Sequence, residues 1–403
     1  MSRTPHATAA PQPLEGLRVV EFTHMVMGPT CGMLLADLGA EVIKVEPLDG
    51  ENTRRLLGAG SGFFPMFNRN KKSIGIDLRN VEGAAVARRL ATSADVVIEN
   101  FRPRALVKFE LDYASLAKHN ERLIYVSHKG FLPGPYEHRT ALDEVVQMMG
   151  GLAYMTGRPG DPLRAGTSIN DIMGGLFGAI GALAALIRRG ITGKGMEVQS
   201  ALFETNVFLM GQHMLQFAMT GRHPAPMPAR ESPWAIYDVF TVKGGEQIFL
   251  AAVSDAQFAT FCDVLGFADL KSDPAYATNN DRVRARPALL TTVRERLALR
   301  AADELATLFE NAGLPFAPIR KPGDLYDDPH LRATGGLADV VLPDGDRRGQ
   351  TVQTTLFPIT LEGARLPVRI HPPQIGEHTQ ELLSGLGYAQ AEIDALRKQH
   401  AVA

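Results

Sequence analysis

A single acidic side chain, Asp171, is the first candidate for chemistry. In the segment AGTSINDIMGG, residues 165–175, it lies between small residues and a long apolar run, residues 172–187. The first turn of a helix offers unpaired N–H groups and the positive end of the helix dipole, which favour an ionised carboxylate and can stabilise an oxyanion. An ionised, positioned and partly desolvated carboxylate can act as a nucleophile. The alternative is a plain helix N-cap, which is a common use of aspartate and which spacing alone favours.

Basic side chains near the ends of predicted strands are the second candidate. Arg and Lys at such positions can neutralise the phosphates of a nucleotide-like ligand. Asn100 and Phe101, in ENFRPR, add an amide and a ring. A solvated charged surface is the alternative for each cation taken alone, and core packing is the alternative for Phe101. The basic residues of this group are Arg69, Lys71, Lys72, Arg79, Arg102, Arg104, Lys108 and Lys129.

The elements that must position these residues alternate between strands and helices. Strand–helix–strand units of about thirty residues are typical of parallel sheets. We therefore expect a doubly wound α/β sheet, which binds ligands beyond the carboxyl ends of its strands. Three of those ends are FTHMV (22–26), ENFRPR (99–104) and SHKGF (127–131). Strands are predicted at 17–23, 41–46, 72–78, 94–101 and 122–131, and helices at 28–40, 81–93 and 113–120.

Further along, the sequence predicts a second, smaller folding unit. The segment 196–221 is typical of a strand that runs into a helix, and the Pro-rich stretch 221–233 indicates a boundary near Pro224. Two β-rich runs within 234–252, around Lys243-Gly244-Gly245, predict a hairpin. Helical patterns continue to about Gly313. A second Pro-rich stretch, 314–331, leads to β-like segments at 338–345 and 354–363 and to a helix at 391–401.

Composition and missing motifs exclude several classes of protein. A formal net charge of -2 over 403 residues provides no basic field for nucleic acid. Neither H-E-x-x-H nor C-x-x-C occurs, so no metal site is expected, and no G-x-G-x-x-G follows the first strand, which removes the main argument for a nicotinamide enzyme. The apolar run from Ile172 is shorter than the ~20 residues that span a membrane. Two distant cysteines, Cys31 and Cys262, and an N-terminus without a signal-peptide core predict a cytoplasmic protein.

Blocks along the whole chain resemble the class III CoA-transferases, a family that includes formyl-CoA transferase and α-methylacyl-CoA racemase. The resemblance begins at Pro13, and the ordered set of blocks is specific. The blocks are LEGLRVVEFTHMVMGPTCGMLLADLGAEVIKVEP (14–47), FNRNKKSIGIDL (67–78), ADVVIENFRPRAL (94–106), GPYEHRTALDEVVQMMGGLAYMTG (134–157), TGKGMEVQSALFETNV (192–207) and PPQIGEHTQELLSGLGY (372–388).

This resemblance implies that Asp171 is the catalytic nucleophile, because it matches the family aspartate between a glycine-containing loop and an apolar helix. In such transferases the carboxylate attacks an acyl-CoA thioester, a mixed anhydride and free CoA thiolate form, and an aspartyl-CoA thioester follows. CoA is then a substrate, and no tightly bound cofactor is implied. Family CoA contacts map onto Val26, Met27, Ile76, Leu78, Arg79, Asn100, Phe101, Arg102, Lys108, Lys129, Gly130 and Phe131.

The resemblance also implies an architecture. A large Rossmann-like, CoA-binding α/β domain comprises residues 13–205, a linker covers 206–233, a small α+β domain covers 234–321, and residues 322–403 return to the large domain. Two chains form an interlocked homodimer, with acyl-CoA and a small carboxylic acid as partners and neither nucleic acid nor membrane. Val26 stands where formyl-CoA transferase has a glutamine, and AAVSDAQF (251–258) replaces its glycine-rich lid loop.

Three functions are compatible with the sequence. The first is CoA transfer between carboxylic acids, such as succinate or a C5 diacid, between two molecules or within one. The second is racemisation or epimerisation of a 2-methylacyl-CoA by a His–Asp pair. Leu142 stands where the racemases carry that histidine, and the nearby His128 and His138 are predicted to be surface or loop residues. The third is a non-catalytic CoA-binding protein, against which the intact Asp171 argues.

Overall fold

Six short strands form one parallel sheet in the computed structural model, which describes residues 10–230 and 232–403. They are β1 (Arg18–Phe22), β2 (Glu41–Glu46), β3 (Lys71–Gly75), β4 (Val96–Glu99), β5 (Ile124–Lys129) and β6 (Met196–Ala201). The strand order is β3-β2-β1-β4-β5-β6, and every neighbouring pair is parallel. The predicted parallel α/β fold is confirmed. Because the order reverses between β1 and β4, the topological switch point lies at the carboxyl ends of these two strands.

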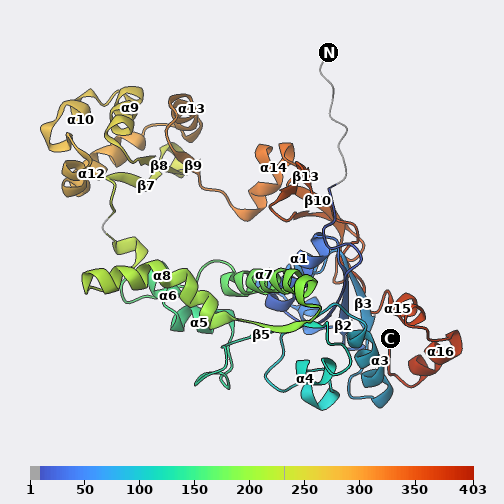
Figure 1. Ribbon diagram of the computed structural model, residues 1–403. Coiled ribbons are helices and arrows are strands. Elements are labelled where there is room, and N and C mark those ends of the chain that lie inside the picture. The colour runs from blue at the N-terminus through green and yellow to red at the C-terminus, as the bar shows by residue number, and fades with distance from the viewer. Residues whose placement is uncertain (1–9, 231) are drawn as a thin grey trace. The chain divides into compact units, whose positions relative to one another are not determined.

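Helices cover both faces of this sheet (Figure 1). They are α1 (Met27–Asp37) and α7 (Ile169–Thr192) on one face, and α3 (Val81–Thr92), α15 (Thr379–Gly385) and α16 (Gln390–Lys398) on the other. Successive strand residues point to opposite faces. Val19 and Val96 therefore pack toward α1 and α7, whereas Val20 and Val97 pack toward α3 and the C-terminal helices. Segments from both halves of the chain thus build one α/β core.

Helix α7 is longer than predicted. It spans 24 residues, and its buried positions include Gly174, Gly178, Ala182 and Ala185, which recur at helical spacing along one face. By length and composition alone it is the one helix of the described chain that could cross a membrane, so the expectation that this run is too short was wrong. Its small-residue face packs against α1 and the sheet, which is the position of a core helix.

The chain divides into two compact units. One runs to Pro228 and continues from Pro329 to Ala403, and the other is Ala229–Asp328. The small domain expected at 234–321 falls within the second unit. There, β7 (Ile236–Thr241), β8 (Gln247–Ala252) and β9 (Phe316–Pro318) form an antiparallel sheet. Its helices are α9 (Asp255–Leu265), α10 (Ala268–Ser272), α11 (Asn279–Arg284), α12 (Arg286–Leu297) and α13 (Ala302–Ala312).

The remaining elements of the first unit are mostly short. Its other helices are α2 (Phe63–Phe67), α4 (Tyr113–Leu116), α5 (Asp143–Met149), α6 (Leu152–Thr156), α8 (Leu202–Thr220) and α14 (Pro329–Ala333). The strands β10 (Leu337–Val341) and β11 (Thr351–Thr355) form one antiparallel pair, and β12 (Thr360–Leu361) and β13 (Ala364–Arg365) form another. The helices α5 and α6, which lead into α7, were not predicted.

Candidate active site

Asp171 lies in the first turn of α7, at the carboxyl edge of the sheet. A crossover helix between parallel strands starts at the edge where the preceding strand ends, and α7 connects β5 to β6. Asp171 is the third residue of α7. Within the described chain no hydrogen bond reaches its carboxylate, and the charges that act on it come from Asp143 and Arg164. Asp171 is therefore not the cap of its own helix.

The cap of α7 is a second carboxylate, Asp143, at the start of α5. Its Oδ1 accepts hydrogen bonds from the backbone N–H groups of Asn170 at 2.8 Å and Asp171 at 3.2 Å. Its Oδ2 accepts one from the Gln147 side chain at 2.5 Å, and Arg164 lies 3.9 Å away. Asp143 thus binds the N–H groups that we expected to be free for an oxyanion. The Asp171 side chain is left without a hydrogen bond from the described chain.

Sequence reasoning missed the role of Asp143. Asp143 directly follows Leu142, the position that we compared with the histidine of the racemases. The signal that could have identified it was an acid directly after Leu142 in the family block 134–157. Gln147, which is fully buried, also accepts the Ala165 N–H at 2.8 Å and so ties the loop before α7 to α5.

Burial, followed by the negative charge of Asp143, raises the pKa of Asp171 from 3.8 to about 7, and the Arg164 guanidinium opposes this rise. We expected a carboxylate held charged. Near neutral pH the group instead divides between its two protonation states. A shift produced by desolvation together with a specific charged neighbour is typical of functional carboxyl groups.

The glycines that follow Asp171 bring α1 close to α7. A Cβ on Gly174 would lie 2.4 Å from Met27 Cε, and one on Gly175 would lie 2.6 Å from the Met27 carbonyl oxygen. These glycines therefore allow close packing of the two helices. A Cβ on Gly166, before the helix, would meet no described atom within 4 Å.

Asn100 joins the carboxyl ends of β1 and β4 at the switch point. Its Oδ1 accepts a hydrogen bond from the His24 N–H at 3.0 Å, and its Nδ2 donates to the His24 carbonyl at 2.8 Å. His24 Nδ1 also lies 3.0 Å from Oδ1, so Nδ1 carries the proton and Nε2 is an acceptor. Burial lowers the pKa of His24, and its ring stacks on Phe101 at 5.4 Å. Two stacked rings therefore lie at this edge.

The residues expected to contact CoA all lie at or just beyond the carboxyl ends of β1, β3, β4 and β5. Those with buried side chains are Val26, Met27, Ile76 and Phe131. Those with exposed side chains are Arg79, Arg102 and Lys108, and those with partly exposed side chains are Leu78, Asn100, Phe101 and Lys129, with Gly130 also partly exposed. Where the side chain is buried, the backbone is the part that a ligand can reach.

Three cations of the basic group pair with carboxylates of the protein itself. Arg69 pairs with Asp37 at 2.6 Å, and Lys71 pairs with Glu21 at 2.8 Å. Lys72, at the amino end of β3, forms ion pairs with two glutamates. Because Arg69 and Lys71 are buried and all three lie at or before the start of β3, the expectation that they face a ligand was wrong.

Lys129 is neutralised by a buried carboxylate. Its Nζ lies 2.5 Å from Glu99 Oε1, to which the Ser127 hydroxyl also donates. Glu99 Oε2 accepts the Phe101 N–H at 2.9 Å and so organises the end of β4. Lys129 and Arg102 line a cavity of about 170 Å³. Arg102 is exposed there, whereas the charge of Lys129 is already balanced.

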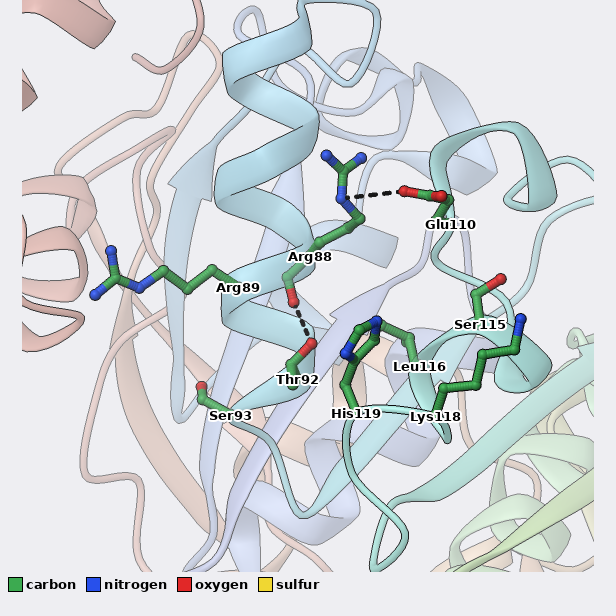
Figure 2. Close-up of a pocket in the computed structure, with 9 residues that line it drawn as sticks. All are labelled: Arg88, Arg89, Thr92, Ser93, Glu110, Ser115, Leu116, Lys118 and His119. Carbon is green, nitrogen blue, oxygen red and sulfur yellow. Dashed lines mark hydrogen bonds and ion pairs between the residues drawn. The ribbon is translucent and has the colours of Figure 1, made fainter.

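A larger cavity, of about 500 Å³, lies at the opposite edge of the sheet (Figure 2). It is lined by residues at the ends of α3 and α4, which run from the carboxyl edge to the amino edge. Figure 2 shows Arg88 directed toward Glu110 and Arg89 directed away from the other lining side chains. The cavity contains no residue of the candidate active site, so its size does not mark the place of the chemistry.

His128 is buried in β5 beneath α7, and the prediction of a surface or loop position was wrong. A Cβ on Gly178 would lie 2.3 Å from its ring, and in the described chain neither ring nitrogen has a hydrogen-bond partner. Burial lowers its pKa to about 3. The ring is therefore neutral and enclosed, and it is not placed to act as the second base of a racemase. His138 is exposed in a loop, as predicted.

Over residues 10–230 and 232–403, no group of three or more His, Cys, Asp or Glu side chains could hold a metal ion.

Comparisons with known proteins show which family the chain resembles over most of its length. The model of CoA-transferase family III matches residues 14–379. Succinate–glutarate CoA-transferase of Agrobacterium fabrum is 33% identical over 387 residues, 93% of this chain and 96% of the relative. Succinyl-CoA:glutarate CoA-transferase of Mus musculus is 31% identical, covering 96% and 89%. The crystal structure of a CAIB/BAIF family protein from Brucella suis has 35% identity and a TM-score of 0.84, covering 93% of this chain and 100% of that one. The chain belongs to CoA-transferase family III and is an enzyme of that class, whose substrates are CoA thioesters.

Proposed function

We propose that the protein transfers CoA between carboxylic acids with Asp171 as the nucleophile. The observation that supports this most directly is the state of the side chain. The carboxyl group lies in the first turn of α7, is largely desolvated, and receives no hydrogen bond from the described chain. Asp143 does the capping in its place. A carboxylate needed only as a cap would bind those N–H groups itself.

The proposed reaction has two halves. The Asp171 carboxylate attacks the thioester carbonyl of the donor, CoA leaves as a thiolate, and an aspartyl acyl anhydride forms. The thiolate then attacks the aspartyl carbonyl, which releases the donor acid and leaves an aspartyl-CoA thioester. In the second half the acceptor carboxylate attacks this thioester and displaces CoA. The thiolate attacks the acceptor's acyl carbonyl, which gives the new CoA ester and restores the Asp171 carboxylate.

We place CoA along the carboxyl edge, on the turn after β1 and beside the end of β4. The exposed guanidinium groups of Arg79 and Arg102 and the ammonium group of Lys108 are suited to the phosphates. Backbone atoms of Val26 and Met27 contact the part of CoA that approaches Asp171. This placement follows the general rule that ligands bind at the switch point of a doubly wound sheet.

We propose a dicarboxylic acid, such as succinate or the C5 diacid glutarate, as donor or acceptor acid. Two relatives that align over almost the whole chain are named for CoA transfer between succinate and glutarate. Transfer between the two carboxyls of one diacid uses the same chemistry.

We also propose that the enzyme works as an interlocked homodimer in the cytoplasm. Large apolar side chains on α7 and α8 are exposed in the single chain, which is typical of a surface covered by a partner. They are Ile180, Ile187 and Ile191 on α7 and Phe208, Met214, Leu215, Phe217 and Met219 on α8. Both cysteines are free and buried, as in reduced proteins.

The test is turnover combined with trapping. Purified protein is mixed with succinyl-CoA and a panel of mono- and dicarboxylates, and new CoA esters are measured by chromatography. Hydroxylamine is then added during turnover, and the Asp171 peptide is examined for an aspartyl hydroxamate by mass spectrometry. Asp171→Ala should abolish transfer and labelling. Asp161→Ala, which changes an exposed carboxylate ten residues earlier, should leave both intact.

Two results would overturn the proposal. One is transfer activity in Asp171→Ala comparable to that of the unaltered protein. The other is exchange of an α-proton of the acyl group without CoA transfer, which would establish racemase chemistry instead.

A further inference from the structure

Two buried lysines bracket the turn that follows β1. Lys44, on β2, donates a hydrogen bond from Nζ to the carbonyl oxygen of Thr23 at 3.0 Å. Lys71, on β3, donates from Nζ to the carbonyl oxygen of Pro29 at 2.9 Å. Thr23 is the last residue before the turn and Pro29 lies in the first turn of α1. Both ends of the segment 24–28 are therefore held by ammonium groups from neighbouring strands.

One carboxylate links the two lysines. Glu21 Oε1 lies 2.8 Å from Lys71 Nζ and 3.5 Å from Lys44 Nζ. Glu51 provides a second carboxylate, 3.4 Å from Lys44 Nζ. All four side chains are almost completely buried. A Cβ on Gly32 would lie 1.8 Å from Glu21 Oε2, so the cluster packs directly against the backbone of α1.

The bracketed turn is held in a conformation that it would not adopt alone. Met25 has a φ of 63°, in the left-handed region that non-glycine residues seldom occupy and that persists only where neighbours determine it. Its N–H donates to Thr53 Oγ1 at 3.0 Å, and Asn100 binds both backbone groups of His24. The turn thus has anchors on β2 and β3, directly after β4, and in the segment after β2.

The same turn contacts the helix of the nucleophile. Met27 packs against Gly174 and Gly175, which lie three and four residues after Asp171 and hence on the same face of α7. A displacement of the turn therefore changes both the backbone of Val26 and Met27 and the packing of the first turns of α7.

We infer that Lys44 and Lys71 are positioning residues that hold the turn after β1 in the conformation that binds acyl-CoA next to Asp171. The inference rests on the proposed function, which places CoA on this turn. Stability alone does not account for the cluster, because buried ion pairs are often no more stabilising than apolar side chains of similar size. Both ammonium groups are instead directed at backbone carbonyls that flank one turn.

The experiment compares variants that differ in the bond to the turn. Glu51→Gln keeps Lys44 and its bond to Thr23, whereas Lys44→Met/Glu51→Gln removes that bond without leaving a buried carboxylate unpaired at position 51. Calorimetry with CoA gives Kd, and initial rates give KM for succinyl-CoA and for the acceptor separately. We expect the double variant to raise Kd for CoA and KM for succinyl-CoA about tenfold, with the acceptor KM unchanged. Glu51→Gln should match the unaltered protein.

Two further variants separate positioning from loss of stability. Arg189→Met/Asp95→Asn removes a partly buried ion pair of 3.0 Å at the opposite edge of the sheet, and it should lower the melting temperature without changing Kd for CoA. Thr53→Val removes the bond to the Met25 N–H without changing any charge, and it should raise Kd about threefold. Thr53→Val supplies the test if Lys44→Met/Glu51→Gln does not fold.

The inference is overturned if Thr53→Val and Lys44→Met/Glu51→Gln both bind CoA with the Kd of the unaltered protein. It is also overturned if the control at the opposite edge weakens CoA binding equally. Failure of the proposed function has a different signature, because the unaltered protein would then bind CoA and transfer none.

Discussion

Two carboxylates, Asp143 and Asp171, lie at the start of α7, and only one of them caps the helix. Asp143 binds the N–H groups of the first turn, which is what a capping anion does. Asp171 is thereby left without a hydrogen bond and close to a like charge, and its pKa rises to about 7. The raised pKa makes the protonation state of Asp171 depend on conditions near neutrality, so two predictions concern pH.

The first prediction concerns the rate. Because only the ionised form is a nucleophile, kcat/KM for acyl-CoA should rise with pH through a midpoint near 7. Asp143→Asn removes the neighbouring charge and should lower this midpoint by about one unit. Initial rates between pH 5 and 9 measure both midpoints. A midpoint that Asp143→Asn leaves unchanged would show that the two carboxyl groups do not interact.

The second prediction concerns stability. The pKa of Asp171 is about 7 in the folded protein and 3.8 ordinarily, so the folded state holds a proton that the unfolded state releases as pH rises through this window. Stability contributed by the neutral form is therefore full below pH 4 and is lost as pH rises through 7. Asp171→Asn removes this penalty and should stabilise the protein above pH 7 by about 2–4 kcal/mol. Urea unfolding at pH 5 and pH 8 checks this, and an equal effect at both values would contradict it.

At the scale of elements, the contact between α1 and α7 couples the CoA-binding turn to the nucleophile. The coupling depends on glycine, because a Cβ on Gly175 would lie 2.6 Å from both the Met27 carbonyl oxygen and Thr30 Cβ. Backbone on both sides of this contact leaves little room for adjustment. The same face of α7 is therefore fixed by packing, and Asp171 is fixed with it.

The third prediction tests that contact. Gly175→Ala should destabilise the protein by about 1–3 kcal/mol through overpacking and should reduce kcat/KM as well. Gly190→Ala is the matched control, because Gly190 lies on the exposed side of the same helix with no described atom within 4 Å of an added Cβ. It should be neutral or stabilising by up to about 1 kcal/mol. Equal effects of the two substitutions would remove the argument from close packing.

Local patterns were enough to predict most of the parallel strands, because β-branched runs between turn residues are a local signal. The prediction for Glu41–Glu46 has the observed bounds. The strand β9 was missed because it pairs with β8 from a Pro-rich stretch more than 60 residues away, and α5 and α6 because short helices carry weak periodicity.

At the site, sequence identified Asp171 but not its surroundings. The cap Asp143 lies 28 residues upstream of Asp171. Lys71 and Arg69 looked available for a ligand because their partners, Glu21 and Asp37, lie 50 and 32 residues away. Such pairings depend on tertiary structure, which spacing along the chain does not encode.

At the scale of the whole molecule, the exposed apolar side chains of α7 and α8 lead to the last prediction, which is that the protein is a dimer. Sedimentation equilibrium should give twice the chain mass at micromolar concentration. Phe208 and Leu215 are 71% and 65% exposed on α8 and lie seven residues apart, on one face. Phe208→Asp/Leu215→Asp should weaken the dimer about tenfold or more, because charges are costly in the centre of an interface. Val81→Asp changes an isolated residue that is 78% exposed on α3 and should leave the mass unchanged. A monomeric unaltered protein would contradict the prediction, and these helices would then need another partner to cover them.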